Sequence, residues 1–322
     1  MTGYFMKKMI SFIATLFLIS LVTFVAFSVI PGDAAVSKAG TNATKEQIEQ
    51  IRENMGLNRP VTERYVEWLQ GAIKGDFGVS LQYTDYEVSE LIAGRLPYTL
   101  ILTLISVIII IVISIPLGVI AAKNENGILN SIITVVTQVS MAIPPFFLGI
   151  LMTYIFGLIL KWFQPGACVD PTVDLMGAVK YLIFPAVAIA IPKIAMTVKF
   201  LKNSIIEQFN SDYVRTALGK GCSKNKVMYG HILGNALIPV ITFMGLVIAE
   251  VVAGSIVIEQ VFSVPGIGRM LVTAILNRDY PVVQATIVYI TISVVVINTL
   301  VDLLYHVIDP RVSIESEGVV HE

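Results

Sequence analysis

Charged residues are scarce in this sequence. They account for 14% of its 322 residues, against 55% for hydrophobic residues, whereas soluble domains usually carry about 25% charged residues. The formal net charge at pH 7 is −1. This balance argues against a nucleic-acid partner, because binding to phosphates requires a basic excess. The composition is that of a membrane protein surrounded by a lipid bilayer.

Motifs for metal, redox or nucleotide chemistry are also missing. The sequence has only three histidines, too few to suggest a histidine metal site. The two cysteines, Cys168 and Cys222, match no zinc or redox spacing. There is no GxxxxGK[ST] loop for ATP, since Gly219-Lys220 lacks both the earlier glycine and the following hydroxyl residue. HExxH and GxSxG motifs are absent as well. We expect no catalytic residue, metal site or cofactor in this chain.

Long apolar runs are what the sequence has instead. A helix needs about 20 mostly apolar residues to cross a bilayer. Six stretches qualify: residues 9–30, 98–122, 129–163, 180–200, 236–262 and 283–307. The first exceeds the about 7–15 apolar residues of a signal peptide, so we expect it to remain as a helix. The sequence predicts an all-α polytopic membrane protein with six transmembrane helices.

The N-terminal tail and the first span together take up residues 1–30, and a polar segment, residues 31–97, follows them. Apolar residues recur at helical spacing in 44–57 and in 61–78, and Gly56 is placed to stop the first of these helices. The second helix is expected to turn one side inward, and that side carries Tyr65, Val66, Leu69 and Ile73. We expect a small helical cap on the outer face of the membrane.

Lysine and arginine cluster in the loop between the fourth and fifth spans, at about residues 201–235. Cytoplasmic loops carry an excess of these residues, so this loop is predicted to be cytoplasmic. Lys7 and Lys8 place the N-terminus on the same side, and six spans return the tail, residues 311–322, to the cytoplasm. Arg269 and Arg278 fall on the opposite side but are fewer.

The basic loop has the pattern of two short helices. Asp212 is predicted to cap the first, the glycines at 219 and 221 to end it, and Ser223 to cap the second. The second helix would carry a partly apolar face at Val227, Met228, Ile232 and Leu233. On chemistry alone two interpretations stay open: a knob presented to a cytosolic partner, or a solvated loop that only sets topology.

Several stretches match one family pattern in order along nearly the whole chain. They are GDFGVS (75–80), RLPYTL (95–100), IPLGVIAA (115–122), DYVRTALGKG (212–221) with HILGNALIP (231–239), GSIVIEQVFSVPGIGRM (254–270), RDYPVVQ (278–284) and NTLVDLLYHVIDPR (298–311). The loop resembles the EAA loop of binding-protein-dependent ABC permeases. The set as a whole resembles the dipeptide/oligopeptide/nickel permease family.

The resemblance implies a type I ABC importer permease with a five-helix core at residues 98–310. It implies pairing with a homologous second permease, two cytosolic ATPase subunits that bind ATP and Mg, and an external solute-binding protein. It also implies the cytoplasmic membrane of a bacterium or archaeon. Short peptides are the expected cargo because most cargo of this family is peptidic. Nickel or a metal chelate is the alternative, and a receptor or scaffold without transport activity is a third possibility.

Carried over residue by residue, the resemblance places the EAA triplet at Arg215, Thr216 and Ala217 and its spaced glycine at Gly221. Residues 222–233 would be the coupling helix that docks on the ATPase. This sequence departs from the family at Leu218-Gly219, where arginine and alanine are common. The expected coupling residues are Asp212, Tyr213, Arg215, Thr216, Ala217, Lys220, Gly221, Ser223 and Val227.

Ionisable residues within spans cost at least about 2.5–3.5 kcal/mol on insertion scales and so need a partner or an aqueous path. Glu250 in the fifth span would either contact a cationic part of the cargo or pair with Lys193 in the fourth span or with the sister permease. Asp302 is expected to be structural. Glu259 is expected to anchor the fold near the outer boundary, and Gly254 to serve backbone shape.

Pro144-Pro145 interrupts the third span. Such a break is tolerated where it lines protein or water. Ser140, Met141 and Pro144 are therefore candidates to line the translocation pathway, together with Lys193 and Glu250, and a kink that serves only helix packing is the alternative for the proline pair.

Overall fold

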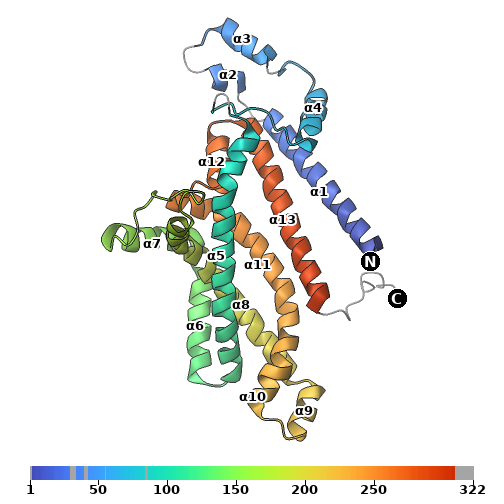
Figure 1. The fold of residues 1–322 in the computed structure, drawn as a ribbon, viewed down its shortest axis with the longest axis vertical. Helices are drawn as coiled ribbons and strands as arrows, with labels where there is room; N and C mark the ends of the chain where they lie inside the picture. The colour runs from blue at the N-terminus through green and yellow to red at the C-terminus, as the bar shows by residue number, and fades with distance from the viewer. Residues whose placement is uncertain (1, 30–33, 40–42, 55, 84–85, 309–322) are drawn as a thin grey trace. The chain divides into compact units, whose positions relative to one another are not determined.

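The structure is a computed structural model of residues 1–322 that describes residues 2–29, 34–39, 43–54, 56–83 and 86–308 (Figure 1). The predicted tail at 311–322, the start of the cap at residue 31 and the side chain of Asp302 lie outside this description. Within it the secondary structure is helical, apart from one isolated antiparallel bridge between Val79 and Glu87. The predicted all-α class is confirmed.

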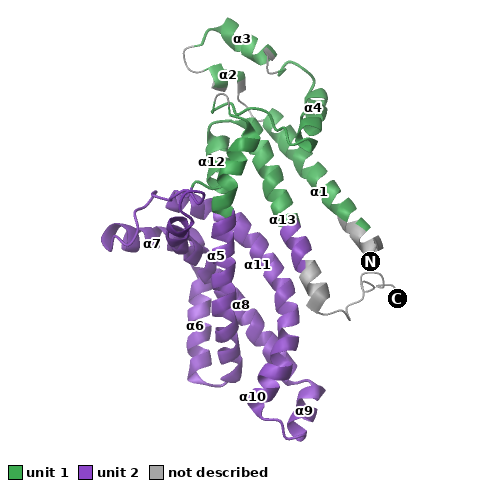
Figure 2. Cartoon of the chain, in the orientation of Figure 1, with its two compact units in different colours: residues 1–99, 265–295 green, residues 100–264, 296–322 purple. Residues whose placement is uncertain are grey.

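The chain divides into two compact units (Figure 2). Unit 1 comprises Met1–Thr99 and Pro265–Val295, and unit 2 comprises Leu100–Val264 and Val296–Glu322. Unit 1 holds α1 (Thr2–Val29), α2 (Ala34–Ala39), α3 (Lys45–Asn54), α4 (Val61–Ile73), α12 (Ile267–Leu276) and the first parts of α5 (Val88–Lys123) and α13 (Tyr280–Ile308). Both α5 and α13 continue into unit 2.

Two of the three short helices between the first spans follow the sequence pattern. A reciprocal capping box starts α3: Thr44 Oγ1 accepts from the Gln47 backbone N–H at 3.3 Å, and Gln47 Oε1 accepts from the Thr44 N–H at 2.9 Å. Gly56 follows α3 with φ +65°, the left-handed conformation that suits a glycine stop. Helix α2 was not predicted.

The inward side of α4 differs from the prediction. Tyr65 is buried, but Val66 is 51% exposed and Ile73 is 79% exposed. Aromatic packing sets the orientation instead, because the Tyr65 and Trp68 rings lie 5.3 and 6.0 Å from the ring of Phe24 on α1. Large rings bury more area than Val66 or Ile73, so they determine which side of the helix faces α1.

Unit 2 is built around one central helix. Its elements are α6 (Ile128–Ala142), α7 (Pro145–Met152), the π-helical turn η1 (Thr153–Ile159), α8 (Leu175–Phe209), α9 (Asp212–Gly219), α10 (Lys224–Val227), the π-helical turn η2 (Met228–Ile232), α11 (Leu233–Phe262) and the remaining parts of α5 and α13. Helix α8 packs against α6, α7 and α11. Its buried side is rich in alanine, and small residues let helices approach closely in membranes.

Five stretches of the described chain are long and apolar enough to cross a membrane: Met9–Val29, Val88–Lys123, Leu175–Phe209, Lys224–Val261 and Tyr280–Val301. The third predicted span is not one kinked helix. Its halves, Ile128–Ala142 and Pro145–Ile159, meet at an angle of 94°, and counting them as one broken span gives six. Ile143 and Pro144 both take extended backbone angles, as expected of residues that precede prolines.

Candidate functional site

The loop after α8 folds into the two predicted short helices. Ser211, not Asp212, is the N-cap of α9, and its side chain makes no capping bond. Asp212 is the first helical residue, where its negative charge favours the helix N-terminus. The side chains of Asp212 and Arg215 are 99% and 76% exposed, with 3.8 Å between Oδ1 and Nη1. An ion pair this exposed contributes little stability, so both groups are free to meet a partner.

A tight turn separates the two helices. Helix α9 ends at Gly219, Lys220 is its C-cap, and Gly221 has φ +82°. No atom would lie within 4 Å of a side chain added at Gly221, so glycine is needed for its backbone and not for space. The Gly221 N–H donates to the Leu218 carbonyl at 2.9 Å, and the Cys222 N–H to the Ala217 carbonyl at 3.2 Å.

The second helix runs into the membrane without a break. Ser223 Oγ accepts from the Lys226 N–H at 3.4 Å, which confirms the predicted cap. Val227, Met228 and Ile232 are each no more than 1% exposed. Residues 222–233 do not form a separate helix, because α10, η2 and α11 follow one another directly in the sequence. The first turn of α11 is held to α8, where Ser204 Oγ donates to the Ala236 carbonyl at 2.9 Å.

Lys123, the last residue of α5, makes a contact that the sequence analysis missed. Its Nζ donates to Asn225 Oδ1 at 3.0 Å and to the Tyr229 hydroxyl at 3.1 Å, and it lies 4.3 Å from the centre of the Tyr229 ring. The only signal in the sequence was a basic residue at the end of a span, which does not distinguish a topology charge from a contact. This contact ties the end of α5 to the α10–η2 segment.

A cleft of about 790 Å³ lies beside this contact. Its walls are the turn after α5, the end of α8, and the α9 and α10 helices; they include Lys123, Asn126, Phe209, Leu218 and Lys224. Leu218 is 41% exposed. The cleft thus combines apolar side chains with two lysines, Glu125 and several amides, which suits a protein surface with complementary side chains better than a small neutral molecule.

We predict that Lys123→Ala loosens the α10–η2 segment without unfolding the protein, because all three side chains in the contact are exposed. Transport should fall about threefold to tenfold, in line with the loss of charged hydrogen bonds and a cation–π contact at an exposed site. Uptake normalised to the amount of protein in the membrane measures it. Lys180→Ala, at an exposed position on α8 outside the cleft, is the charge-matched control, and equal losses in the two variants would contradict a specific role for Lys123.

Lys193 on α8 and Glu250 on α11 form an ion pair. The Lys193 side chain is 18% exposed and that of Glu250 is 52% exposed. The sequence left open whether Glu250 pairs with Lys193, with a sister permease or with the cargo, and in the structure it pairs with Lys193. Half of the Glu250 side chain nevertheless remains uncovered, so a second contact to cargo or to a sister subunit is still sterically possible.

The remaining predicted residues are scattered. Ser140 and Met141 lie in the last turn of α6, beside the 94° bend that Pro144 introduces, and Met141 is 42% exposed. Glu259 is fully buried. Gly254 lies inside α11 without a positive φ and with open space around it, so the structure gives no backbone reason for glycine there.

Asp279 was missed although it stands in one of the quoted motifs. It is 1% exposed in unit 1. Its carboxylate accepts from the hydroxyl of Ser80 and from the backbone N–H groups of Leu81 and Gln82, both at 3.1 Å. Sequence spacing cannot reveal this contact, because about 200 residues separate its halves and a lone aspartate before an apolar run looks like a helix cap. The contact holds the segment after α4 against the start of α13.

Comparison with known proteins identifies the family. Residues 114–314 match the binding-protein-dependent transport system inner membrane component, and residues 1–103 match the N-terminal part of such components. The chain is 36% identical to the oligopeptide transport system permease protein AppB of Bacillus subtilis over 97% of this chain and 99% of the relative. It is 33% identical to the probable peptide ABC transporter permease protein y4tP of Sinorhizobium fredii over 96% and 98%.

A solved structure supports the fold. The inward-facing MetNI methionine ABC transporter matches with a TM-score of 0.53 and 17% identity, over 68% of this chain and 96% of that chain. At this identity the likeness shows the fold alone. The two family matches together reach from the first span to residue 314, and the relatives agree over nearly the full length. The chain belongs to the family of binding-protein-dependent transport system inner-membrane components.

Proposed function

We propose that this chain is one of two homologous permease subunits of an ATP-driven importer that carries short peptides across the cytoplasmic membrane. The observation that carries the proposal is the full-length similarity to peptide permeases at 33–36% identity. An importer of this family works with ATPase and binding-protein partners. The proposed assembly has two ATPase subunits, which bind ATP and Mg, and one external solute-binding protein that delivers the peptide.

The α9–α10 region is the proposed contact with the ATPase. Arg215 and Thr216 are exposed on α9, and the cleft beside Lys123 is open to a partner. Movement of the ATPases would be received at these side chains and passed into α11, because α10, η2 and α11 are consecutive. Binding of ATP inside and of the loaded binding protein outside would then favour different states of the permease, which is what a two-state transporter requires.

Uptake by cells that lack only this chain tests the proposal. The cells are offered labelled dipeptides to pentapeptides and, separately, nickel. We expect peptide uptake to be lost and to return with the wild-type chain but not with Gly221→Pro, since proline cannot adopt φ +82°. Loss of nickel uptake with peptide uptake intact would overturn the peptide assignment.

We place both termini and the α9–α10 loop in the cytoplasm, and the two free cysteines provide the test. Burial raises the pKa of the Cys168 thiol to about 11, so at pH 7.5 it is almost entirely protonated and slow to react with maleimide. A membrane-impermeant maleimide should label Cys222 in inside-out vesicles and not in intact cells. Cys222→Ser is the control, and labelling of Cys222 in intact cells would reverse the orientation.

We also propose that the open side of Glu250 contacts cationic parts of the cargo. Glu250→Gln should reduce uptake of lysine-containing peptides about tenfold more than uptake of neutral peptides, since it removes one charge–charge contact. Competition between the two peptide classes in one assay measures the ratio independently of protein amount. Equal loss for both classes would contradict the proposal and leave Glu250 as the ion-pair partner of Lys193.

A further inference from the structure

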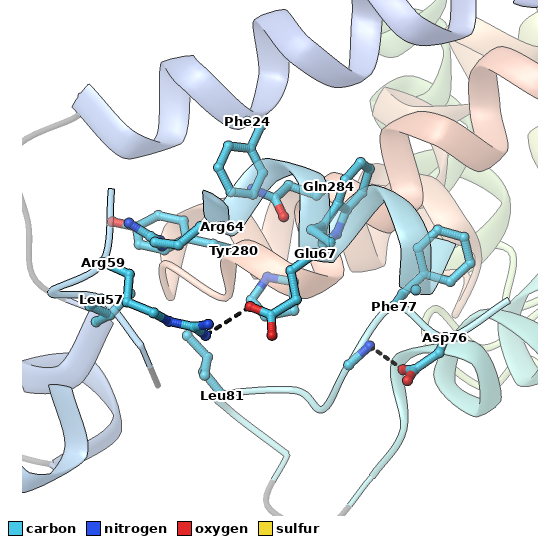
Figure 3. Close-up of a pocket in the computed structure, with 14 residues that line it drawn as sticks. Phe24, Leu57, Arg59, Arg64, Glu67, Asp76, Phe77, Leu81, Tyr280 and Gln284 are labelled. Atoms are coloured by element: carbon cyan, nitrogen blue, oxygen red, sulfur yellow. Dashed lines mark hydrogen bonds and ion pairs between the residues drawn. The ribbon is translucent and has the colours of Figure 1, made fainter. Parts of the chain in front are cut away.

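A cavity of about 370 Å³ lies within unit 1. It is bounded by α1, α4, the segments on either side of α4, and the first turns of α13 (Figure 3). Four aromatic side chains form much of its wall: Phe24, Trp68, Phe77 and Tyr280. The cavity contains none of the proposed coupling or pathway residues.

Two arginines and two carboxylates line the cavity, and one of the carboxylates, Asp76, accepts a hydrogen bond from a backbone N–H at 2.8 Å. Arg59 is neutralised by Glu67, with 2.8 Å between Nη2 and Oε2 (Figure 3). Arg64 has no carboxylate within ion-pair distance in the described parts of the chain, and its guanidinium lies 5.8 Å from the Phe24 ring. Burial, and secondarily the charge of Arg59, lower the pKa of Arg64. A half-buried guanidinium that has no carboxylate partner favours an anion.

Two hydrogen-bond donors on the same wall also lack partners. The Trp68 Nε1–H and the Tyr280 hydroxyl are buried with no hydrogen bond in the described structure. Leaving a buried polar group unpaired costs about 1–3 kcal/mol. An anionic group bound in the cavity has several oxygens, each of which can accept a hydrogen bond from such a donor.

The position of the cavity along α1 indicates where the anion comes from. Phe24 lies five residues before Val29, the end of α1, which corresponds to about 7–8 Å along the helix. The apolar stretch Met9–Val29 is only 11% buried, and Leu18, Val22 and Val25 on it are at least 42% exposed. The arginine is thus held near the end of an exposed apolar span, at the level where tryptophan and tyrosine side chains gather in membrane proteins.

We propose that this cavity binds the phosphate of an anionic phospholipid, with Arg64 as the cation and the exposed side of α1 as the surface for the acyl chains. The planar guanidinium matches the forked oxygens of a phosphate. A small free anion has no apolar part that could contact the aromatic wall or the exposed apolar side of α1. These surfaces therefore favour a lipid over inorganic phosphate or a dissolved peptide. The bound lipid joins α1 to α4 and to the start of α13.

The purified complex tests this inference in detergent and in nanodiscs. Native mass spectrometry and thermal shift are measured with phosphatidylglycerol, phosphatidylcholine, glycerol phosphate and trialanine. We expect phosphatidylglycerol to stay bound and to raise the Tm, and Arg64→Gln to weaken its binding about tenfold or more. Arg52→Gln, on α3 and outside the cavity, is the charge-matched control. Arg64→Lys should restore part of the affinity, because it keeps the charge but loses the fork.

A second readout remains valid if Arg64→Gln folds poorly. In a Trp162→Phe background Trp68 is the remaining tryptophan of this chain, and subtracting the signal of a complex that also carries Trp68→Phe isolates its fluorescence from that of the partner subunits. Brominated phosphatidylglycerol should quench this fluorescence at a low, saturable fraction of total lipid. Quenching equal to that by brominated phosphatidylcholine would overturn the proposal. So would equal stabilisation by glycerol phosphate, which would indicate a site for small anions, or by trialanine alone, which would indicate a cargo site. These outcomes are independent of whether peptides are transported.

Discussion

Cells that carry Gly221→Ala should import the cargo about 5–30 times more slowly than wild type. An L-residue in the left-handed region costs about 1–2 kcal/mol, and Gly221 has φ +82° at the turn that joins α9 to α10. Alanine there favours a different turn and so moves α9 relative to α10. The result is measured as uptake and as ATP hydrolysis per molecule transported, both normalised to the amount of complex.

Gly219→Ala is the matched control, only two residues away. Gly219 ends α9 without a positive φ, and like Gly221 it has no atom within 4 Å of the position of an added side chain. The two substitutions therefore add the same methyl group in equally open space and differ only in the backbone. Gly219→Ala should transport as wild type does. A loss as large as that of Gly221→Ala would show that the surface of α9, and not the turn, limits coupling.

The second large effect is expected at the ion pair between Lys193 and Glu250. Lys193→Met and Glu250→Met each leave one charge in an apolar span, at a cost of about 2.5–3.5 kcal/mol on insertion scales. Each single variant should reach the membrane in smaller amount and unfold at lower temperature. The double variant should recover most of the stability, because removing both charges leaves none unpaired.

The double variant also separates structure from transport. If the pair serves stability alone, the recovered protein should carry all peptides normally. If Glu250 also meets the cargo, the double variant should be stable but poor with cationic peptides. A stable Glu250→Met single variant would contradict the expected loss and would indicate that Lys193 has another partner or reaches water.

Local chemistry and hydrophobic length allowed much of this fold to be predicted. Gly56, Gly221 and Ser223 lie where the sequence placed a stop, a turn and a cap, because each depends on neighbouring residues only. The apolar runs became helices for the same reason, since lipid leaves a spanning segment no other way to pair its backbone.

The features that escaped prediction all depend on distant partners. The inward side of α4 is set by Phe24, more than 40 residues away, and the contacts of Lys123 and Asp279 cross about 100 and 200 residues. The 94° bend at Pro144 was visible as a break, but prolines do not specify an angle. The continuity from α10 into α11 was missed because hydrophobic length placed the start of the fifth span at residue 236, after the basic loop at 201–235.

That continuity has a mechanical consequence. From Lys224 to Phe262 the chain is one run of consecutive helical turns, with a length of about 58 Å at 1.5 Å per residue. A rod of that length pivoting by about 5° at one end displaces its other end by about 5 Å. Small movements at the α10 end would therefore produce larger displacements at the other end. Such a rod can bend at η2 and at Pro239, and bending there would reduce the displacement of its other end.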